Sequence, residues 1–159
     1  LHVECFGDSP LIDSQLIDDF INYYIKENDK DLYLSSALRT TYPPGTEVIL
    51  YHPDILIKVD DLVKKDDPLR EHVGYNISRF PEMFNIQSLE APEHLNYPDI
   101  YLEVDAHEDL ELIRKITAHF KSKKKNYFSL KEILKFLHEN NDLILENQCI
   151  KRRWRKFRN

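Results

Sequence analysis

The order of apolar patterns along this 159-residue chain predicts an α/β fold whose sheet is mixed and partly parallel. Two observations carry this prediction. Short apolar runs alternate with longer segments in which apolar residues recur at helical spacing, and turn residues separate them. Hydrophobic residues make up 42% of the chain and aromatic residues 11%, which indicates a folded domain rather than a disordered one. The length suits a single domain with a core of its own.

The first half of the chain holds three predicted strands and two predicted helices. Residues 1–6 (LHVECF) form a short apolar run that ends at the turn signal GDSP, which predicts a strand. Residues 14–27 show helical spacing of apolar side chains, and Asp13 or Ser14 can cap that helix. The other predicted elements here are strands over 32–35 and 46–51, the latter introduced by a Pro-Pro-Gly turn, and a helix over 54–64.

The second half continues the alternation of strands and helices. Residues 68–79 are mixed in character, with a helix predicted after Pro68. Strands are predicted over 84–89 and 100–104, and apolar residues alternate in the second of these. A helix is predicted over 107–120, and a further helix that runs to about residue 139 begins at the capping box formed by Ser129 and Glu132.

Composition excludes several classes of protein. No apolar run approaches the roughly 18 residues that a membrane-spanning helix needs, and the first residues lack the features of a signal peptide. Cys5 and Cys149 form neither a disulfide framework nor a zinc-binding spacing. These features predict a protein without a membrane span that works in the cytoplasm.

Charge is distributed unevenly around a net value of −6. Residues 151–159 (KRRWRKFRN) carry six basic side chains and no acidic one. Such a tail can bind anions such as nucleic acid or membrane headgroups, or it can be a solvated C-terminal end, which could also dock on the acidic body of its own domain. We favour the second interpretation, and nucleic acid is not expected as a partner, because a short tail without a folded basic face is a poor nucleic-acid site.

Glycine is scarce, and its three positions, Gly7, Gly45 and Gly74, lie far apart. Nucleotide-binding α/β proteins usually place several glycines in the loop where backbone N–H groups approach phosphates. Either any phosphate is bound here by groups other than a glycine-rich loop, or that loop is missing from this chain.

Two aspartates follow predicted strands. Asp8 comes after the strand at 1–6, and Asp105 comes after the strand at 100–104. Ligands of open α/β sheets bind beyond the carboxyl ends of the strands, and one or two carboxylates with substrate phosphates hold Mg²⁺. The alternative for Asp105 is that its side chain caps the helix that follows.

Four segments resemble, in the same order, the spore-coat polysaccharide type cytidylyltransferases, which are relatives of the synthetases that make CMP-activated acidic sugars. The segments are 7–13 (GDSPLID), 42–48 (YPPGTEV), 70–73 (REHV) and 104–112 (VDAHEDLEL). The resemblance implies a Rossmann-like nucleotide-diphospho-sugar transferase fold, of the glycosyltransferase-A type. The sequence departs from the family at Ser9, which replaces a cysteine, and at residues 106–107, where Ala-His replaces Thr-Pro.

The resemblance also implies an incomplete enzyme. The family's glycine- and arginine-rich nucleotide loop lies well upstream of the GDSPLID-like segment, and nothing here corresponds to it. On this basis residues 1–150 are the C-terminal part of a single cytidylyltransferase-like domain, and residues 151–159 are a basic tail. This chain alone is then expected to be inactive.

By the same resemblance, Asp8 and Asp105 are catalytic and hold Mg²⁺. The turn from Tyr42 to Glu47 and the triplet at 70–72 would lie around a sugar pocket. Arg70 can bind a sugar carboxylate with its planar fork, and His72 can orient or deprotonate the attacking hydroxyl. The substrate-binding set implied by the resemblance is Tyr42, Gly45, Glu47, Arg70, Glu71 and His72. Without the resemblance, the triplet reads as an ion pair at a helix start beside a core histidine.

The implied reaction uses CTP and an acidic sugar to give a CMP-sugar for surface polysaccharide biosynthesis. The resemblance also implies a homodimer, although no particular residue of this sequence indicates one. Two other functions remain open. One is a non-catalytic binding or assembly module, and the other is a related nucleotide-sugar glycosyltransferase with the same general layout.

Overall fold

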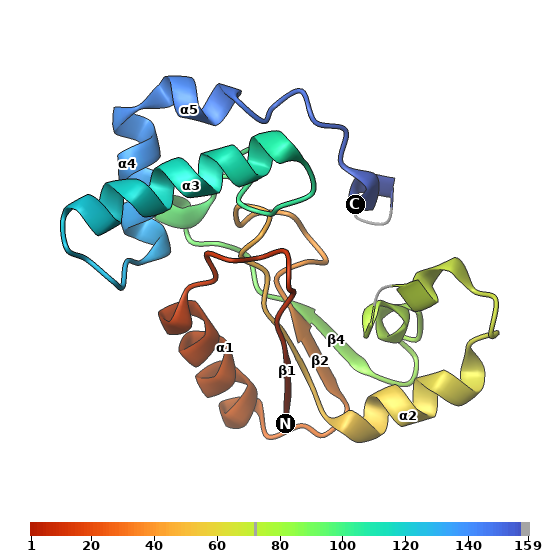
Figure 1. Cartoon of the computed structure of the whole chain (residues 1–159). Coiled ribbons are helices and arrows are strands. Elements are labelled where there is room, and N and C mark those ends of the chain that lie inside the picture. The colour runs from red at the N-terminus through yellow and green to blue at the C-terminus, as the bar shows by residue number, and fades with distance from the viewer. Residues whose placement is uncertain (72, 157–159) are drawn as a thin grey trace.

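A computed structural model describes residues 1–71 and 73–156, and it contains a four-stranded mixed sheet in the order β1-β3-β2-β4 (Figure 1). The strands are β1 (His2–Glu4), β2 (Leu32–Ser35), β3 (Ile49–Tyr51) and β4 (Asn85–Ser88). Strand β3 is antiparallel to both β1 and β2, whereas β2 and β4 are parallel. Strands β1, β2 and β4 therefore point the same way, and the predicted α/β class with a mixed sheet is confirmed.

Both faces of the sheet are covered. Leu34 and Leu50 face one side, where they pack with α1 (Ser14–Glu27), α3 (His107–Ser122) and α4 (Leu130–Glu139). Tyr33 and Tyr51 face the other side, where they pack with α2 (Pro53–Leu62) and the short 3-10 helix η2 (Tyr75–Arg79). This alternation follows from the two-residue period of a strand. Because both faces are buried, all four residues of β2 are apolar or small and lie in the core.

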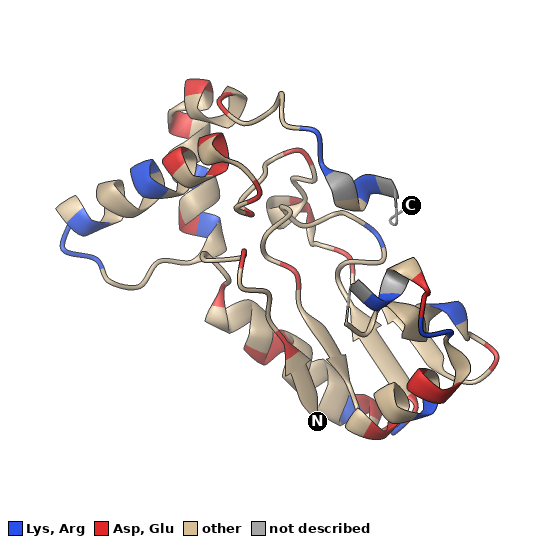
Figure 2. Cartoon of the chain, turned by 45° about the vertical axis from the view of Figure 1, so that its right-hand side comes forward, with Lys and Arg blue, Asp and Glu red and all other residues tan. Residues whose placement is uncertain are grey.

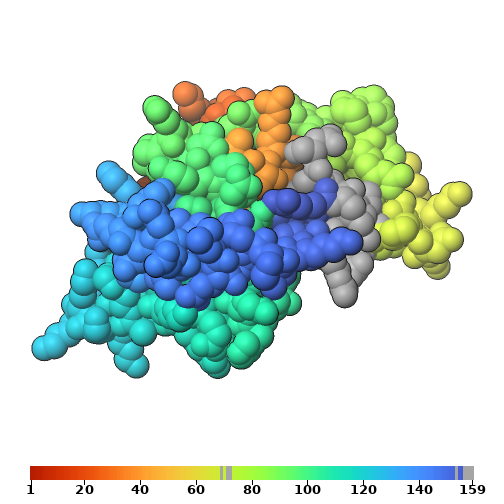
Figure 3. Space-filling view, turned by 90° about the horizontal axis from the view of Figure 1, so that it is seen from above, coloured from red at the N-terminus to blue at the C-terminus, as the bar shows by residue number. Residues whose placement is uncertain are grey.

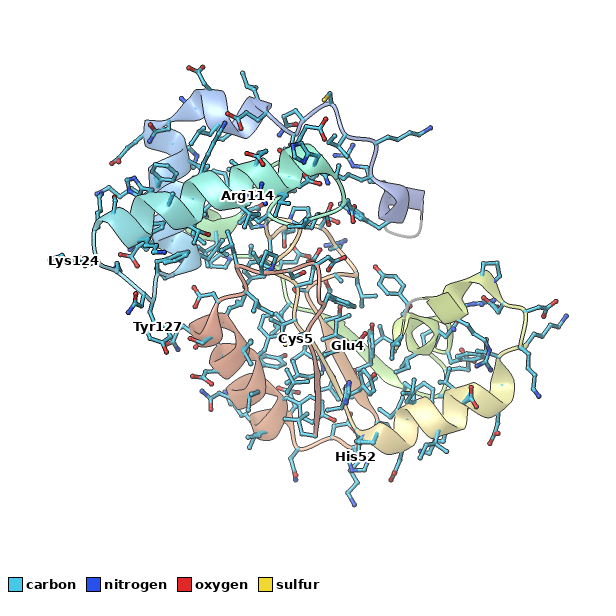
Figure 4. The ribbon with its side chains drawn as sticks, viewed as in Figure 1. Glu4, Cys5, His52, Arg114, Lys124 and Tyr127 are labelled. Carbon is cyan, nitrogen blue, oxygen red and sulfur yellow. The ribbon has the colours of Figure 1, made fainter. Side chains whose placement is uncertain are left out.

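Shorter elements complete the chain. Short 3-10 helices connect the main elements at η1 (Pro68–Glu71), η3 (Glu93–Leu95) and η4 (Arg153–Lys156). A five-residue helix, α5 (Asn141–Leu145), follows α4 and was not predicted. Lys124 and Tyr127 lie at the tip of the connection between α3 and α4, far from the C-terminal segment (Figure 4). Among the described residues no helix is long and apolar enough to cross a membrane.

Helix caps largely follow the sequence. Asp13 caps α1 by accepting the Gln15 N–H at 2.9 Å, and its second oxygen accepts the Leu130 N–H at 2.7 Å. One carboxylate thus joins the starts of α1 and α4. The predicted capping box of α4 is present, because Ser129 Oγ accepts the Glu132 N–H and Glu132 accepts the Ser129 N–H.

The predicted strand over 100–104 is wrong. The segment is buried, as its alternation indicates, but its N–H groups bond to two separate loops instead of a neighbouring strand. The Leu102 N–H donates to the Pro44 carbonyl at 2.7 Å, and the Val104 N–H donates to the Asp8 carbonyl at 2.8 Å. Strand β3 also begins later than predicted, at Ile49, because the turn around Gly45 extends to Glu47.

Candidate active site

The carboxyl ends of β1, β2 and β4 lie along one edge of the sheet, which is where open α/β sheets bind ligands. Asp8 lies beyond the end of β1, in a turn closed by the Ser9 N–H bonding to the Phe6 carbonyl at 3.1 Å. Its side chain is exposed and accepts the Ser9 hydroxyl at 3.3 Å. The carboxylate of Asp8 therefore faces solvent at the ligand-binding edge.

The segment that carries Asp105 runs next to Asp8. Since the Val104 N–H bonds to the Asp8 carbonyl, the following residue, Asp105, lies beside the Asp8 turn. The Asp105 side chain keeps 39% of its surface exposed. Asp105 does not cap α3: the cap position is Ala106, and Asp109 accepts the N–H groups of both Asp105 and Ala106 at 3.0 and 2.9 Å. The partly exposed Asp105 carboxylate thus lies at the same edge as that of Asp8, with its Oδ2 3.9 Å from Arg152 Nη1.

Gly45 fixes the position of the acidic segment. Its φ of +94° lies in the left-handed region, and a Cβ at this position would lie 2.2 Å from the Glu103 backbone nitrogen. Only glycine lets the Pro44–Gly45 turn approach residues 102–103 so closely. Glu47, buried in the same turn, accepts the Gly45 N–H at 2.8 Å and closes it. Gly45 and Glu47 therefore shape the loop that supports the site.

Tyr42 lies in the core. Its ring packs edge-on against Phe20 with centroids 6.3 Å apart, and burial raises the pKa of its hydroxyl. The sequence placed Tyr42 around the sugar pocket, and the structure shows its side chain anchoring the start of the 42–47 loop.

Arg70 lies on the opposite side of the sheet, at the end of α2. Its guanidinium donates to the Asp60 carboxylate at 2.6 Å and to three backbone carbonyls, those of Asp60, Val63 and Lys64. Carbonyls in the last turn of a helix lack intrahelical partners, so Arg70 serves as their cap. To bind a sugar carboxylate, its fork would first have to leave these acceptors. Glu71 belongs to η1, but its side chain and the whole of His72 lie outside the described residues.

The C-terminal segment docks on the acidic body. Arg152 is buried, with its Nη1 3.5 Å from Glu103 and 3.9 Å from Asp105, and the Trp154 Nε1 donates to Glu103 at 2.7 Å. Figure 2 shows the basic C-terminal segment beside the acidic loop before α3, and Figure 3 shows the blue C-terminal part of the chain running across the face that is seen from above. Burial raises the pKa of Glu103 to about 7, although the Trp154 hydrogen bond opposes this. Arg152 and Trp154 thus dock on the acidic body, whereas the solvated end that we favoured from sequence describes Arg155, whose side chain is 56% exposed.

The donors at this edge fit a magnesium ion that is shared with a substrate. Among residues 1–71 and 73–156, no group of three or more His, Cys, Asp or Glu side chains could hold a metal ion alone. Asp8 and Asp105 offer two solvent-accessible carboxylates, and Mg²⁺ in nucleotide enzymes commonly takes one or two carboxylates, with phosphates and water completing the shell. The donor set therefore suits a metal that arrives with phosphate ligands.

Comparison with known proteins finds relatives in sequence and in structure. No protein-family model matches the sequence. The spore coat polysaccharide biosynthesis protein SpsF of Bacillus subtilis is 28% identical over 143 residues, which are 90% of this chain and 57% of that protein. A cytidylyltransferase from Leptospira borgpetersenii has the same fold, with a TM-score of 0.79 and 25% identity over 94% of this chain and 60% of its own. The chain is related to the cytidylyltransferases.

This relationship confirms the resemblance predicted from the four segments. A further relative of this chain is an uncharacterised protein of Methanocaldococcus jannaschii. It is 29% identical over a match that covers 87% of this chain and 53% of that protein. The chain therefore spans a little over half the length of the relatives it matches.

Sequence reasoning missed four residues of this site. Glu103, Asp109, Asn147 and Arg152 meet beneath Asp105, and two of the four, Asn147 and Arg152, lie more than forty residues from any predicted site residue. A signal existed only for Asp109, because an acidic residue three positions after a helix cap commonly accepts backbone N–H groups there. Nothing in the basic run 151–159 singles out Arg152.

Proposed function

We propose that this chain provides the metal-binding and sugar-binding part of a cytidylyltransferase that activates an acidic sugar. In the proposed reaction, a sugar hydroxyl attacks the α-phosphate of CTP, the bond from the α-phosphorus to the β-phosphate bridge breaks, and a CMP-sugar and pyrophosphate form. The single observation that carries the proposal is that the segments of Asp8 and Asp105 lie side by side, through the hydrogen bond from the Val104 N–H to the Asp8 carbonyl, at the ligand-binding edge of a fold shared with a cytidylyltransferase.

The chemistry of the edge supports a nucleotidyl transfer. Phosphoryl-type transition states need little covalent help and depend on charge neutralisation and alignment. Mg²⁺, when held by Asp8 and Asp105, would supply that neutralising charge at the phosphates. The SpsF relative is a spore coat polysaccharide biosynthesis protein, which supports a surface-glycan sugar as the acceptor in this proposal.

We propose that the sugar binds between the 42–47 loop and the 70–72 triplet. Arg70 and His72 are the side chains in this region whose chemistry suits a sugar acid. Because Arg70 caps α2, we expect its contact with the sugar to require rearrangement of the Asp60 ion pair.

The test is pyrophosphate release by the protein as its gene encodes it, with CTP, Mg²⁺ and a panel of acidic sugars. We expect Asp8→Asn to lower turnover by roughly a hundredfold or more, since it removes charge at the point where the metal neutralises the phosphates. Asp99→Asn is the matched control, because the Asp99 side chain is 83% exposed and its Oδ1 lies 3.8 Å from Arg155.

Three outcomes would contradict the proposal. Absence of turnover with every nucleotide and sugar tested, together with measurable CTP binding, favours the binding-module alternative. Transfer from a preformed nucleotide-sugar without any triphosphate favours the glycosyltransferase alternative. Equal turnover of Asp8→Asn and Asp99→Asn would remove Asp8 from the site.

A further inference from the structure

Asp109 joins the Asp105 segment to the rest of the domain. Its side chain is fully buried, and Oδ2 accepts the N–H groups of Asp105 and Ala106 at 3.0 and 2.9 Å. A single carboxylate oxygen therefore holds two successive backbone groups, one of which belongs to the candidate metal ligand itself. This contact fixes the backbone at Asp105 and thereby the direction in which the Asp105 side chain points.

The C-terminal arm, residues 147–155, holds Asp109 in turn. Arg152 donates to both oxygens of Asp109, at 2.8 and 2.6 Å, and the Asn147 amide donates to Oδ1 at 2.8 Å. The Arg152 side chain is 1% exposed, and its guanidinium lies 4.5 Å from the centre of the Tyr101 ring. Asn147 also donates to the Tyr101 carbonyl at 3.0 Å, so the arm forms a hydrogen bond to the segment before Asp105 as well.

Charge explains why this contact is stiff. Burial alone would raise the pKa of Asp109, but the hydrogen bonds from Arg152 and Asn147 outweigh burial and lower the pKa below its ordinary value. A charged, bidentate pair in a site without solvent has strong geometric preferences, because neither partner can exchange its bonds for water. The same guanidinium lies 3.9 Å from Asp105 Oδ2, so its charge also acts on the candidate ligand.

We propose that Arg152 and Asp109 are positioning residues that hold the Asp105 carboxylate in the geometry required for Mg²⁺, so that docking of the C-terminal arm completes the metal site. The inference rests on the proposed function, because it takes Asp105 as a metal ligand. It assigns a role in that site to a residue 47 positions away, in a run that otherwise reads as a solvated basic tail.

The first experiment measures amide exchange by NMR in this chain and needs no catalysis. Arg152→Lys keeps a positive charge beside Asp109 and removes the bidentate fork, so it tests positioning once circular dichroism shows that the variant is folded. We expect the Asp105 and Ala106 amides to exchange at least fivefold faster in Arg152→Lys, and the Ile133 and Leu134 amides of α4 to keep their rates. Arg155→Lys is the matched control from the same arm and is expected to leave all four rates within twofold.

The second experiment measures turnover against Mg²⁺ concentration in the protein as its gene encodes it. We expect Arg152→Lys to raise the half-saturating Mg²⁺ concentration at least fivefold while the KM for the sugar changes less than twofold. A role in stability alone would leave both values unchanged in the folded variant. Asp109→Asn, which keeps the volume of the side chain and removes its charge, is expected to shift the Mg²⁺ dependence in the same direction.

The two proposals fail in different ways. If the wild type shows no turnover, the proposed function fails, and the Mg²⁺ role of Arg152 falls with it even where amide exchange responds. If the wild type turns over, unchanged Asp105 and Ala106 exchange or unchanged Mg²⁺ dependence in folded Arg152→Lys overturns this inference alone.

Discussion

Replacement of Gly45 by alanine is expected to destabilise the domain more than the same change at either of the other two glycines. Gly45 has a φ of +94°, and its added Cβ would lie 2.2 Å from the Glu103 nitrogen and 2.4 Å from the Leu102 carbonyl carbon. These neighbours are backbone atoms of a buried segment, so they cannot rotate away as a side chain would. The chain must move by about an ångström to relieve the overlap, since ordinary carbon contacts begin near 3.5 Å.

The expected cost has two parts. A residue with a Cβ pays about 1–2 kcal/mol for a left-handed backbone conformation. Forcing an extra methyl group into a closely packed region adds about 1–3 kcal/mol. We therefore expect Gly45→Ala to lower the free energy of unfolding by about 2–5 kcal/mol, a large part of the roughly 5–15 kcal/mol that holds an ordinary domain together.

The other two glycines supply matched controls. A Cβ at Gly7 meets nothing within 4 Å, so Gly7→Ala is expected to change the free energy of unfolding by less than about 1 kcal/mol. At Gly74, with a φ of +74°, the nearest atoms belong to the side chains of Glu4 and Tyr51, at 3.0 and 3.1 Å. Side chains can shift, and we expect an intermediate loss. Figure 4 labels Glu4 among the strands, where this adjustment would occur.

Urea unfolding of the three variants at 25 °C, followed by far-UV circular dichroism, measures these free energies. Unchanged slopes would show that the midpoints report stability rather than a change in the denatured state. The expected order of loss is Gly45→Ala, then Gly74→Ala, then Gly7→Ala. A loss below about 1 kcal/mol for Gly45→Ala, or one equal to that of Gly7→Ala, would refute the close approach of the 44–45 turn to the acidic segment.

Two further predictions concern the core. Burial raises the pKa of Glu4 from 4.5 to about 7, although a hydrogen bond from the Tyr51 hydroxyl lowers that pKa in part. The folded state therefore holds the Glu4 proton more tightly than the unfolded chain does. This stabilisation is complete below about pH 4.5 and is lost as the pH rises through 7, and at 1.36 kcal/mol per pH unit it amounts to about 3 kcal/mol. Glu4→Gln should therefore flatten the fall in the urea midpoint between pH 5 and pH 8, and identical pH curves for variant and wild type would contradict the burial of a neutral Glu4. Ile116→Ala, at a fully buried position in α3, should cost about 2–5 kcal/mol in the same assay, whereas Ile57→Ala, whose residue is 66% exposed, should cost less than about 1 kcal/mol.

Much of the fold was predictable because its signals are local. Helical spacing placed the helix at 107–120, and the structure has it at His107–Ser122. The Ser129 and Glu132 capping box marked the start of α4 because both hydrogen bonds form within one turn. The segment 100–104 was mispredicted for the opposite reason. Its alternation reports burial, but which partner receives its N–H groups depends on loops that lie 58 and 96 residues away.

The candidate site was predictable in part. Asp8 and Asp105 were found through turn and strand signals and through the family resemblance, and the structure brings their segments together. Their metal role stays a prediction, as do the roles of Arg70, Glu71 and His72. The supporting contacts of Asp109 could not be predicted, because its partners Asn147 and Arg152 lie 38 and 43 residues along the chain.

The basic run at 151–159 shows why composition alone cannot assign the role of a charged segment. Arg152 and Arg155 lie three residues apart in one short stretch, yet their side chains are 1% and 56% exposed. The difference comes from the acceptors: Asp109 offers Arg152 two buried carboxylate oxygens, whereas Arg155 meets the Tyr101 hydroxyl and ring at the surface. A guanidinium can leave water only where such acceptors replace its hydration. Conversely, Glu103, Asp105 and Asp109 lie within seven residues of one another, and the buried cation offsets their mutual repulsion. The acidic segment and Arg152 therefore require each other, and the net charge of −6 conceals a local pairing that both the fold and the candidate metal site depend on.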